Sequence, residues 1–324
     1  MGKQYDHGNW IAQSKHDIPD FMIIGAMKSG TTTLHEMLNR HPDIAIPRGE
    51  LFFFSQDDIA EHPNFASRDS HGLTGRASSE HYPDWTWYRE QQKVATNARL
   101  CGEDSTTYLC SKRAITRIAM QPKPVKLIVM LRHPTLRAYS QYWHMVRARR
   151  ALYSFEDTLR FMPQQLLSRS HYLSQLEWVY QHVPRAQVKV IQFETFIHHS
   201  QQVLDDVSDF LEIDRAKFPE GTFTMHENAG QLPRFLTLEL IFNRIKRGHD
   251  GLSSSHFSKT KSEKRVLRAL YRILNPLVNK RPPKMNVATK QYLDMYFQQE
   301  LEGLDELVGQ PLLATWFKSE VSRS

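Results

Sequence analysis

Uninterrupted apolar runs alternate along the chain with segments whose apolar residues recur at helical spacing. Three runs, Phe21–Gly25, Val125–Leu131 and Val188–Phe193, have the pattern of strands buried on both faces. A helical pattern follows each run, over Thr31–Arg40, Thr135–Arg150 and Gln201–Leu211. Strand followed by helix, repeated, predicts an α/β fold in which helices flank a central parallel sheet.

Other segments complete this prediction. Helical spacing predicts four more helices, over Ser170–His182, Leu236–Arg247, Lys261–Leu274 and Thr289–Val308. Asp57–Gln92 is rich in His, Ser, Pro and Trp, and we expect an irregular excursion there. Gly248–Ser258 has the composition of a flexible loop.

The composition of the 324 residues is that of an ordinary globular protein, 40% hydrophobic and 24% charged. The first twenty residues lack the apolar core of a secretion signal, and no apolar run has the length of a membrane span. The two cysteines, Cys101 and Cys110, lack metal-ligand spacing. We therefore expect a soluble, cytoplasmic, single-domain protein with no metal site.

Positive charge is concentrated near the C-terminus. The net charge is +7, but positions 244–284 hold twelve cations and only two acids. This basic stretch is a solvated helical face or mobile segment, or else a surface for an anionic ligand, an acceptor or a membrane. Nucleic acid is disfavoured, because no zinc-finger spacing, RRM signature or recognition-helix motif accompanies the charge.

The loop after the first predicted strand has the composition of an anion cradle, Gly25-Ala-Met-Lys28-Ser29-Gly30-Thr31-Thr32-Thr33. Free N–H groups at a helix start bind phosphate, and glycines allow its close approach. Lys28 adds a cation, and the threonines add hydroxyls. The loop departs from the GxxxxGK[ST] pattern, since Thr31 follows Gly30. A plain turn with Gly and Thr for capping is the alternative.

A second phosphate-binding pattern follows the second predicted strand. Arg132 at the strand end offers bidentate recognition of a phosphate, and Pro134 suits the first turn of the next helix. Ser140 lies two helical turns further on. A strand-end ion pair for Arg132 and a backbone-bonded Ser140 are the alternatives. We expect a solvated face for the remaining arginines of this helix, Arg137, Arg147, Arg149 and Arg150.

Together these motifs resemble the sulfotransferases that use 3′-phosphoadenosine 5′-phosphosulfate (PAPS). Lys28 to Leu34 is similar to the family's loop for the 5′-phosphosulfate, and Arg132 to Tyr142 to its 3′-phosphate motif. The nearest branch is that of carbohydrate, heparan-type enzymes and their bacterial relatives. The resemblance implies a single P-loop-like domain over residues 20–317, with an N-terminal extension over residues 1–19.

The resemblance implies transfer of a sulfuryl group to an acceptor hydroxyl, with no metal required. In-line transfer needs a cation at the leaving phosphate and a base for the acceptor proton. Lys28 is the candidate cation. Glu50 is the candidate base, because the Phe-rich run Leu51–Phe54 should raise its pKa by desolvation. The carbohydrate branch carries its base glutamate in this segment, whereas a surface acid is the alternative.

Three further residues are site candidates by resemblance. Glu103 and Asp104 are either acid/base or acceptor-positioning groups, or they fix local structure; Asp104 stands where the polysaccharide enzymes carry a catalytic lysine. The loop His226–Gly230 falls where the family has a segment that closes over the 3′-phosphate, although the family's Lys-Gly or Arg-Gly pair is not reproduced. By this resemblance, Arg234 is the candidate cation for the 3′-phosphate.

Two other functions remain open at this point. An ATP-dependent kinase would use the same kind of loop, but it would need GK[ST]. A non-catalytic nucleotide-binding module would dock through its basic stretch. The acceptor could be a carbohydrate, a glycolipid or another alcohol, because specificity in such folds lies in loops.

Overall fold

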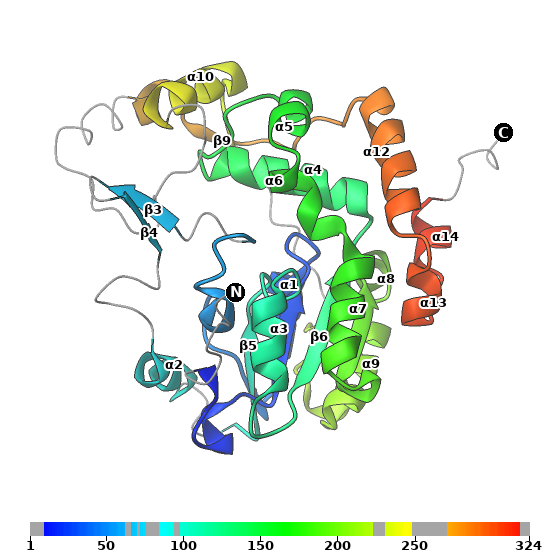
Figure 1. Ribbon diagram of the computed structural model, residues 1–324. Helices are drawn as coiled ribbons and strands as arrows, with labels where there is room; N and C mark the ends of the chain where they lie inside the picture. Colours follow the sequence, from blue (N-terminus) through cyan, green and yellow to red (C-terminus); the bar gives the residue numbers. More distant parts are fainter. Residues whose placement is uncertain are drawn as a thin grey trace, which may run out of the picture.

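The fold is described from a computed structural model, for residues 10–61, 66–69, 72–75, 84–93, 98–222, 231–247 and 271–317. Its centre is a five-stranded sheet with the strand order β2-β5-β1-β6-β7 (Figure 1). The strands span Phe21–Gly25 (β1), Ile44–Ala45 (β2), Leu100–Asp104 (β5), Lys126–Leu131 (β6) and Val188–Gln192 (β7). Every neighbouring pair in this sheet is parallel, so the predicted fold class is confirmed.

Successive residues of the central strands enter two separate cores. Met22 and Ile24 of β1 belong to the larger core, whereas Phe21 and Ile23 belong to the smaller one. The alternation follows from the pleat, which points successive side chains to opposite faces. Burial on both faces explains why β1 reads as a continuous apolar run.

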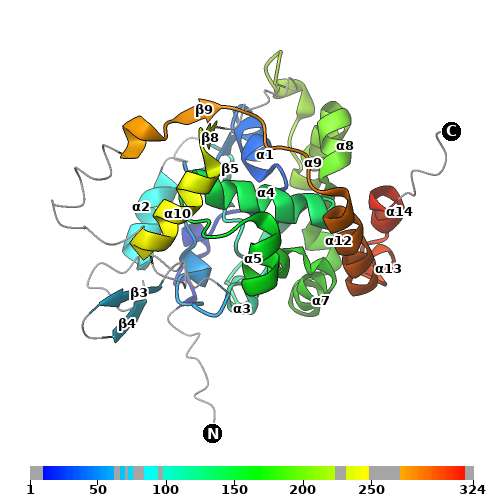
Figure 2. The same cartoon turned by 90° about the horizontal axis from the view of Figure 1, so that it is seen from above.

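Helices cover both faces of the sheet (Figures 1 and 2). The smaller core joins the sheet to α1 (Thr31–Leu38), α8 (Phe193–His198) and α9 (Ser200–Leu211). The larger core includes α3 (Lys112–Ala119) and α7 (Tyr172–His182). It also takes in α4 (Pro134–Arg147), which lies across the upper end of the sheet in Figure 1. The carboxyl ends of β1 and β6 therefore lie beneath α4 in Figure 1.

The remaining elements lie around this centre. The helices are α2 (Trp85–Gln92), α5 (Phe155–Phe161), α6 (Gln164–Leu167), α10 (Leu236–Arg247), α12 (Val287–Glu300), α13 (Leu304–Val308) and α14 (Leu312–Trp316). Two antiparallel pairs join β3 (Ala66–Asp69) to β4 (Gly72–Gly75), and β8 (Gln231–Pro233) to β9 (Leu277–Asn279).

Some predicted elements need correction. The stretch 57–92, expected to be irregular, contains β3, β4 and α2. The single helix expected over Thr289–Val308 is divided into α12 and α13, because Gly303 adopts a left-handed conformation with φ of 90°. The predicted helix Lys261–Leu274 is described only from residue 271 onward, and residues 271–274 are helical, as predicted. The loop Gly248–Ser258 lies wholly outside the described residues.

Candidate active site

The loop between β1 and α1 forms a cradle at the carboxyl edge of the sheet. Gly30 caps α1 with φ of 86°, and a Cβ there would lie 2.8 Å from the ring of Phe193. Glycine is therefore required by both conformation and space. The hydroxyl of Ser29 is buried and has no hydrogen-bond partner among the described residues. A buried polar atom without a partner is costly, so it marks a place for a ligand oxygen.

The predicted phosphate-loop residues differ in exposure. Thr31 is buried in the first turn of α1, Thr32 is exposed and Thr33 is half-buried. Lys28 adopts a left-handed conformation with φ of 70°. Burial, together with the nearby charges of Arg147 and Arg132, lowers the pKa of Lys28 to about 8, and the charge of Glu50 partly opposes this shift. Three cations gathered in this way are the electrostatic signature of a site for an anionic ligand.

Arg132 joins the second motif to the first. Its Nη1 donates to the backbone oxygen of Lys28 at 3.1 Å, and its guanidinium lies 4.7 Å from the ring centre of Phe193. The hydroxyl of Tyr172 on α7 donates to the backbone oxygen of Arg132 at 2.9 Å, which fixes the strand end. The Nε of Arg132 is buried without a partner among the described residues. The two motifs, about a hundred residues apart in sequence, thus form one site.

A cavity of about 660 Å³ opens beside Arg132. It is lined by Arg132, Ser140 and Arg147 from one side and by Arg281, Lys284 and Lys290 from the C-terminal segment. Tyr139 and Trp143 add aromatic surface. A basic cavity with aromatic walls suits a ligand that carries both phosphates and a planar ring.

The sequence did not single out Arg281, Lys284 or Lys290 as cavity residues. The excess of cations in the basic stretch was the available signal for Arg281 and Lys284, whereas Lys290 lies outside that stretch. Arg234, the residue expected to bind the 3′-phosphate, is not among the residues that line this cavity. It is exposed, and its guanidinium lies over the ring of Phe235, 5.4 Å from the centre. The preceding loop, His226–Gly230, lies outside the described residues.

The expectation that Arg137 belongs to a solvated face of α4 is wrong. Its side chain is fully buried. It donates to the hydroxyl of Ser170 at 2.5 Å and to the backbone oxygen of Leu166. Arg137 therefore connects α4 to the segment before α7, and only part of the predicted face, including Arg147, is exposed.

Glu50 lies on the loop between β2 and the Phe-rich turn. Its Oε1 accepts hydrogen bonds from the backbone N–H of Thr106, at 2.9 Å, and from the hydroxyl of the same residue. Burial raises the pKa of Glu50, and the neighbouring Asp104 raises it further. No described residue donates to Oε2 of Glu50. The side chain is thus held by one oxygen, while the other can accept a proton.

Glu103 and Asp104, at the end of β5, occupy different environments. Glu103 is fully buried and accepts hydrogen bonds from three hydroxyls, those of Tyr88 and Tyr108 at 2.5 Å and Ser105 at 2.8 Å. These bonds favour the structural alternative for Glu103. Asp104 Oδ2 lies 3.3 Å from Nδ1 of His35, whereas its buried Oδ1 has no described partner. Burial raises the pKa of Asp104, as it does that of Glu103.

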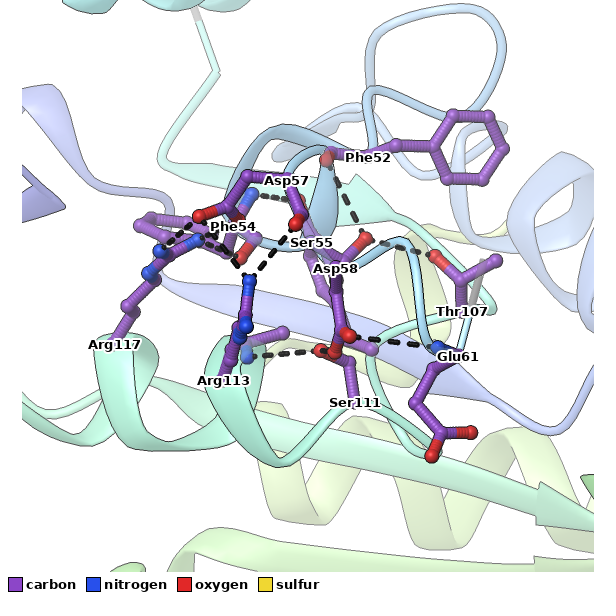
Figure 3. Close-up of polar contacts among 12 residues, drawn as sticks. Phe52, Phe54, Ser55, Asp57, Asp58, Glu61, Thr107, Ser111, Arg113 and Arg117 are labelled. Atoms are coloured by element: carbon purple, nitrogen blue, oxygen red, sulfur yellow. Dashed lines mark hydrogen bonds and ion pairs between the residues drawn. The ribbon is translucent and has the colours of Figure 1, made fainter. Parts of the chain in front are cut away.

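The chain that follows Glu50 is fixed by a polar network (Figure 3). Asp57 forms a bidentate ion pair with the buried Arg117, at 2.6 and 2.8 Å. The same guanidinium donates to the backbone oxygen of Phe54 at 2.8 Å, and Ser111 donates to Asp58 at 2.5 Å. The network anchors this loop to α3 just beyond Glu50.

These features define a class of protein. A phosphate cradle, a basic cavity and a buried carboxylate with one accessible oxygen, all at one sheet edge, are the parts of a nucleotide-dependent transferase. Residues 19–217, more than half of the chain, match the model of the sulfotransferase family. The chain therefore belongs to the sulfotransferase family, and the resemblance seen in its motifs is confirmed.

Curated relatives and solved structures agree with this assignment. The chain is 28% identical over 213 residues to mouse heparan sulfate glucosamine 3-O-sulfotransferase 3A1, covering 63% of this chain and 48% of that protein. It is 26% identical over 246 residues to mouse heparan sulfate glucosamine 3-O-sulfotransferase 5, covering 72% of this chain and 64% of that protein. The chain thus spans about half to two thirds of the length of these relatives.

A solved sulfotransferase from Alicyclobacillus acidocaldarius has the same fold. The TM-score is 0.61 at 24% identity, and the match covers 92% of this chain and 98% of the other. Across the described ranges, no helix combines the length and apolarity needed to cross a membrane. In the same ranges, no three His, Cys, Asp or Glu residues are grouped as metal ligands.

Proposed function

We propose that this protein transfers a sulfuryl group from PAPS to the hydroxyl of an acceptor. The observation that carries the proposal is the contact between Arg132 and the backbone of Lys28, which unites two phosphate-binding motifs beside a basic cavity. Family membership supplies the reaction class. A kinase is disfavoured because the lysine precedes Gly30 instead of following it.

The residues of the site fit such a donor. The buried, unpartnered hydroxyl of Ser29 and the first turn of α1 would hold the 5′-phosphosulfate with Lys28, Gly30, Thr31, Thr32 and Thr33. Arg132 and Ser140, facing the cavity, would hold the 3′-phosphate. Arg281 and Lys284, which line the cavity, would supply the positive charge for the 3′-phosphate that the sequence led us to expect from Arg234.

Lys28 and Glu50 divide the chemistry between them. When bound, the donor supplies the sulfuryl group, and its nucleotide departs as the 3′,5′-bisphosphate. The Oε2 of Glu50 takes the proton of the acceptor hydroxyl as the new oxygen–sulfur bond forms. Lys28, when protonated, stabilises the charge that gathers on the departing phosphate oxygen as the old oxygen–sulfur bond breaks. The hydrogen bonds from Thr106 keep Glu50 aimed during this step.

The acceptor is proposed to be a carbohydrate or a lipid-linked hydroxyl. The relatives named above act on heparan sulfate glucosamine, which supports a sugar. Asp104 differs from the lysine of the polysaccharide enzymes, and we propose that it helps to position the acceptor through its unpartnered Oδ1. A negative charge at this position disfavours a highly sulfated acceptor next to Asp104.

Calorimetric titration with 3′-phosphoadenosine 5′-phosphate, compared with ADP and MgATP, tests the donor site. We expect binding that needs the 3′-phosphate and that weakens about 10- to 100-fold in Arg132→Ala, the usual effect of losing a charged hydrogen bond. Lys93→Ala, which removes an exposed lysine, is the matched control. Equal binding of ADP would contradict the donor assignment, and magnesium-dependent ATP turnover would favour the kinase.

Turnover with a panel of sugar and alcohol acceptors tests the base. Glu50→Gln should lower kcat about 100-fold or more while nucleotide binding survives, because a general base contributes about 10²–10⁴-fold. Glu90→Gln, an exposed substitution, should leave kcat unchanged. Unchanged turnover in Glu50→Gln would reassign the base, and nucleotide binding without turnover on any acceptor would favour the non-catalytic module.

A further inference from the structure

The outward face of α10 is apolar. Leu238 and Ile241 are each 41% exposed, and Ile245 is 81% exposed. Their spacing of three and then four residues places them along one face of the helix. A helix that packs against a soluble domain normally turns polar residues outward, so this stripe reverses the usual pattern.

The opposite face of α10 is firmly attached to the protein. Glu239 and Asn243 are buried there, and Asn243 donates to the backbone oxygen of Ala151 at 2.9 Å. Glu239 accepts from the hydroxyl of Tyr271 at 2.9 Å, and the ring of Tyr271 stacks on Phe242 with centres 3.8 Å apart. These contacts fix the rotation of α10 about its axis and so determine that Leu238, Ile241 and Ile245 face outward.

Further apolar side chains are held next to the start of α10. Asn275 forms hydrogen bonds with both backbone groups of Phe235, at 2.8 and 3.1 Å, and so joins the 271–275 segment to the start of α10. Phe235 is 51% exposed, and Ile273 and Leu274, in the helical part of this segment, are 75% and 69% exposed. Figure 1 shows α10 at the upper edge of the molecule, away from the central sheet.

Exposed cations accompany these apolar residues. The described ones are Arg234, Arg244, Arg272, Lys280 and Arg281. The only acid of α10, Glu239, is fully buried and bonded to Tyr271. Among the described residues, the apolar stripe is therefore accompanied by positive charge that no exposed acid of α10 offsets.

We propose that α10 and the 271–281 segment form a membrane-binding face that docks on a bilayer with anionic headgroups. A bilayer accepts both features at once, because apolar side chains enter the acyl boundary while cations meet the headgroups. A second copy of the chain would bring the same positive charges together. Nucleic acid would satisfy the cations but leave the Leu and Ile side chains in water.

The membrane-binding face adjoins the donor cavity and shares Arg281 with it. Leu232 of β8 and Arg281 after β9 line the donor cavity, and β8 and β9 pair directly next to α10. Docking through this face would thus hold the cavity near the membrane surface. The proposal stands without the proposed function, because it rests on the exposure and charge of α10 and the 271–281 segment.

Co-sedimentation of the full chain with vesicles tests the proposal. We expect binding to vesicles that contain phosphatidylserine, little binding to pure phosphatidylcholine, and loss of binding at high salt through screening. Leu238→Ser/Ile241→Ser/Ile245→Ser should weaken binding at least about tenfold by removing inserted apolar groups. Arg244→Gln should weaken it about fivefold, the usual effect of one cation at an anionic surface.

A matched control separates this face from general apolar exposure. Tyr292 and Met295 of α12 are 70% and 66% exposed, and Tyr292→Ser/Met295→Ser should leave vesicle binding unchanged. The circular dichroism spectrum and the thermal unfolding transition verify that each variant is folded. Two results would overturn the proposal. One is wild-type protein that does not bind anionic vesicles, as when a protein partner is the occupant of this face. The other is a triple variant that binds like wild type.

Discussion

The affinity for the donor nucleotide should fall as the pH rises through the pKa of Lys28. Burial, together with Arg147 and Arg132, lowers that pKa to about 8. Only the protonated lysine attracts the phosphate, so deprotonation removes one cation from the site. The nucleotide phosphates lose their last proton near pH 6, so their charge is constant above pH 7. Burial raises the pKa of Cys101 to about 12, which keeps this thiol from titrating in the same range.

The size of the effect follows from this pKa. With a pKa of about 8, about nine tenths of Lys28 is protonated at pH 7 and about one tenth at pH 9. The dissociation constant of 3′-phosphoadenosine 5′-phosphate should therefore increase about tenfold between these pH values, or about 1.4 kcal/mol. Loss of folded protein at high pH would not explain this increase in the dissociation constant. A lysine with a depressed folded-state pKa adds stability as the pH rises above about 8, because the unfolded chain still binds the proton.

Calorimetry at pH 7, 8 and 9, in buffers of equal ionic strength, measures the change. Lys28→Met is the informative variant, because it should bind weakly and with the same affinity across this range. Lys28→Arg should keep the affinity independent of pH, since its guanidinium stays charged. A wild-type affinity that is constant from pH 7 to 9, or a Lys28→Met variant that still shows the tenfold change, would refute the assignment of this titration to Lys28.

Three other outcomes are expected. Turnover should be bell-shaped in pH, rising through the raised pKa of Glu50 and falling above about 8 as Lys28 deprotonates; a flat profile would contradict their roles. Arg117→Met should lower the free energy of unfolding, measured by urea titration, by about 3 kcal/mol, because Asp57 loses its buried partner. Arg113 is more exposed, so Arg113→Met should lower the free energy of unfolding by about 1 kcal/mol or less. Glu103→Gln should cost about 1–3 kcal/mol through mismatched hydroxyl bonds; unaltered stability would remove Glu103 from its structural role.

The position of the two phosphate-binding motifs was predictable from the sequence because each motif is local. The β1 strand, its glycines and Lys28 lie within ten residues, and the requirements of a phosphate cradle fix both residue type and order. Arg132 follows a strand of equally clear pattern. Parallel strands then bring the two motifs to the same edge of the sheet without further information.

The parts that were missed depend on long-range contacts. Strand β5 reads Leu-Cys-Gly-Glu-Asp, whose acidic end gave no sign of a buried strand. Glu103 is stable there because the hydroxyls of Tyr88, Tyr108 and Ser105 surround it. In the sequence, Arg137 likewise could not be distinguished from the surface arginines of its helix. Its burial depends on the hydroxyl of Ser170 and the backbone oxygen of Leu166, which accept its hydrogen bonds. Burial of a charge is decided by partners that sequence spacing does not specify.

The contrast between Glu50 and Glu103 shows how one fold gives two buried carboxylates different capacities. Burial raises the pKa of both side chains. Glu103 meets three donors, and moving it would leave those hydroxyls unpaired in the core. Glu50 is bound at Oε1 by a single residue, Thr106, and its Oε2 has no described donor. A proton can therefore arrive at Glu50 without breaking a network, whereas the same event at Glu103 would break one. The number of hydrogen bonds, more than burial, therefore supports the proposal that Glu50 is the base.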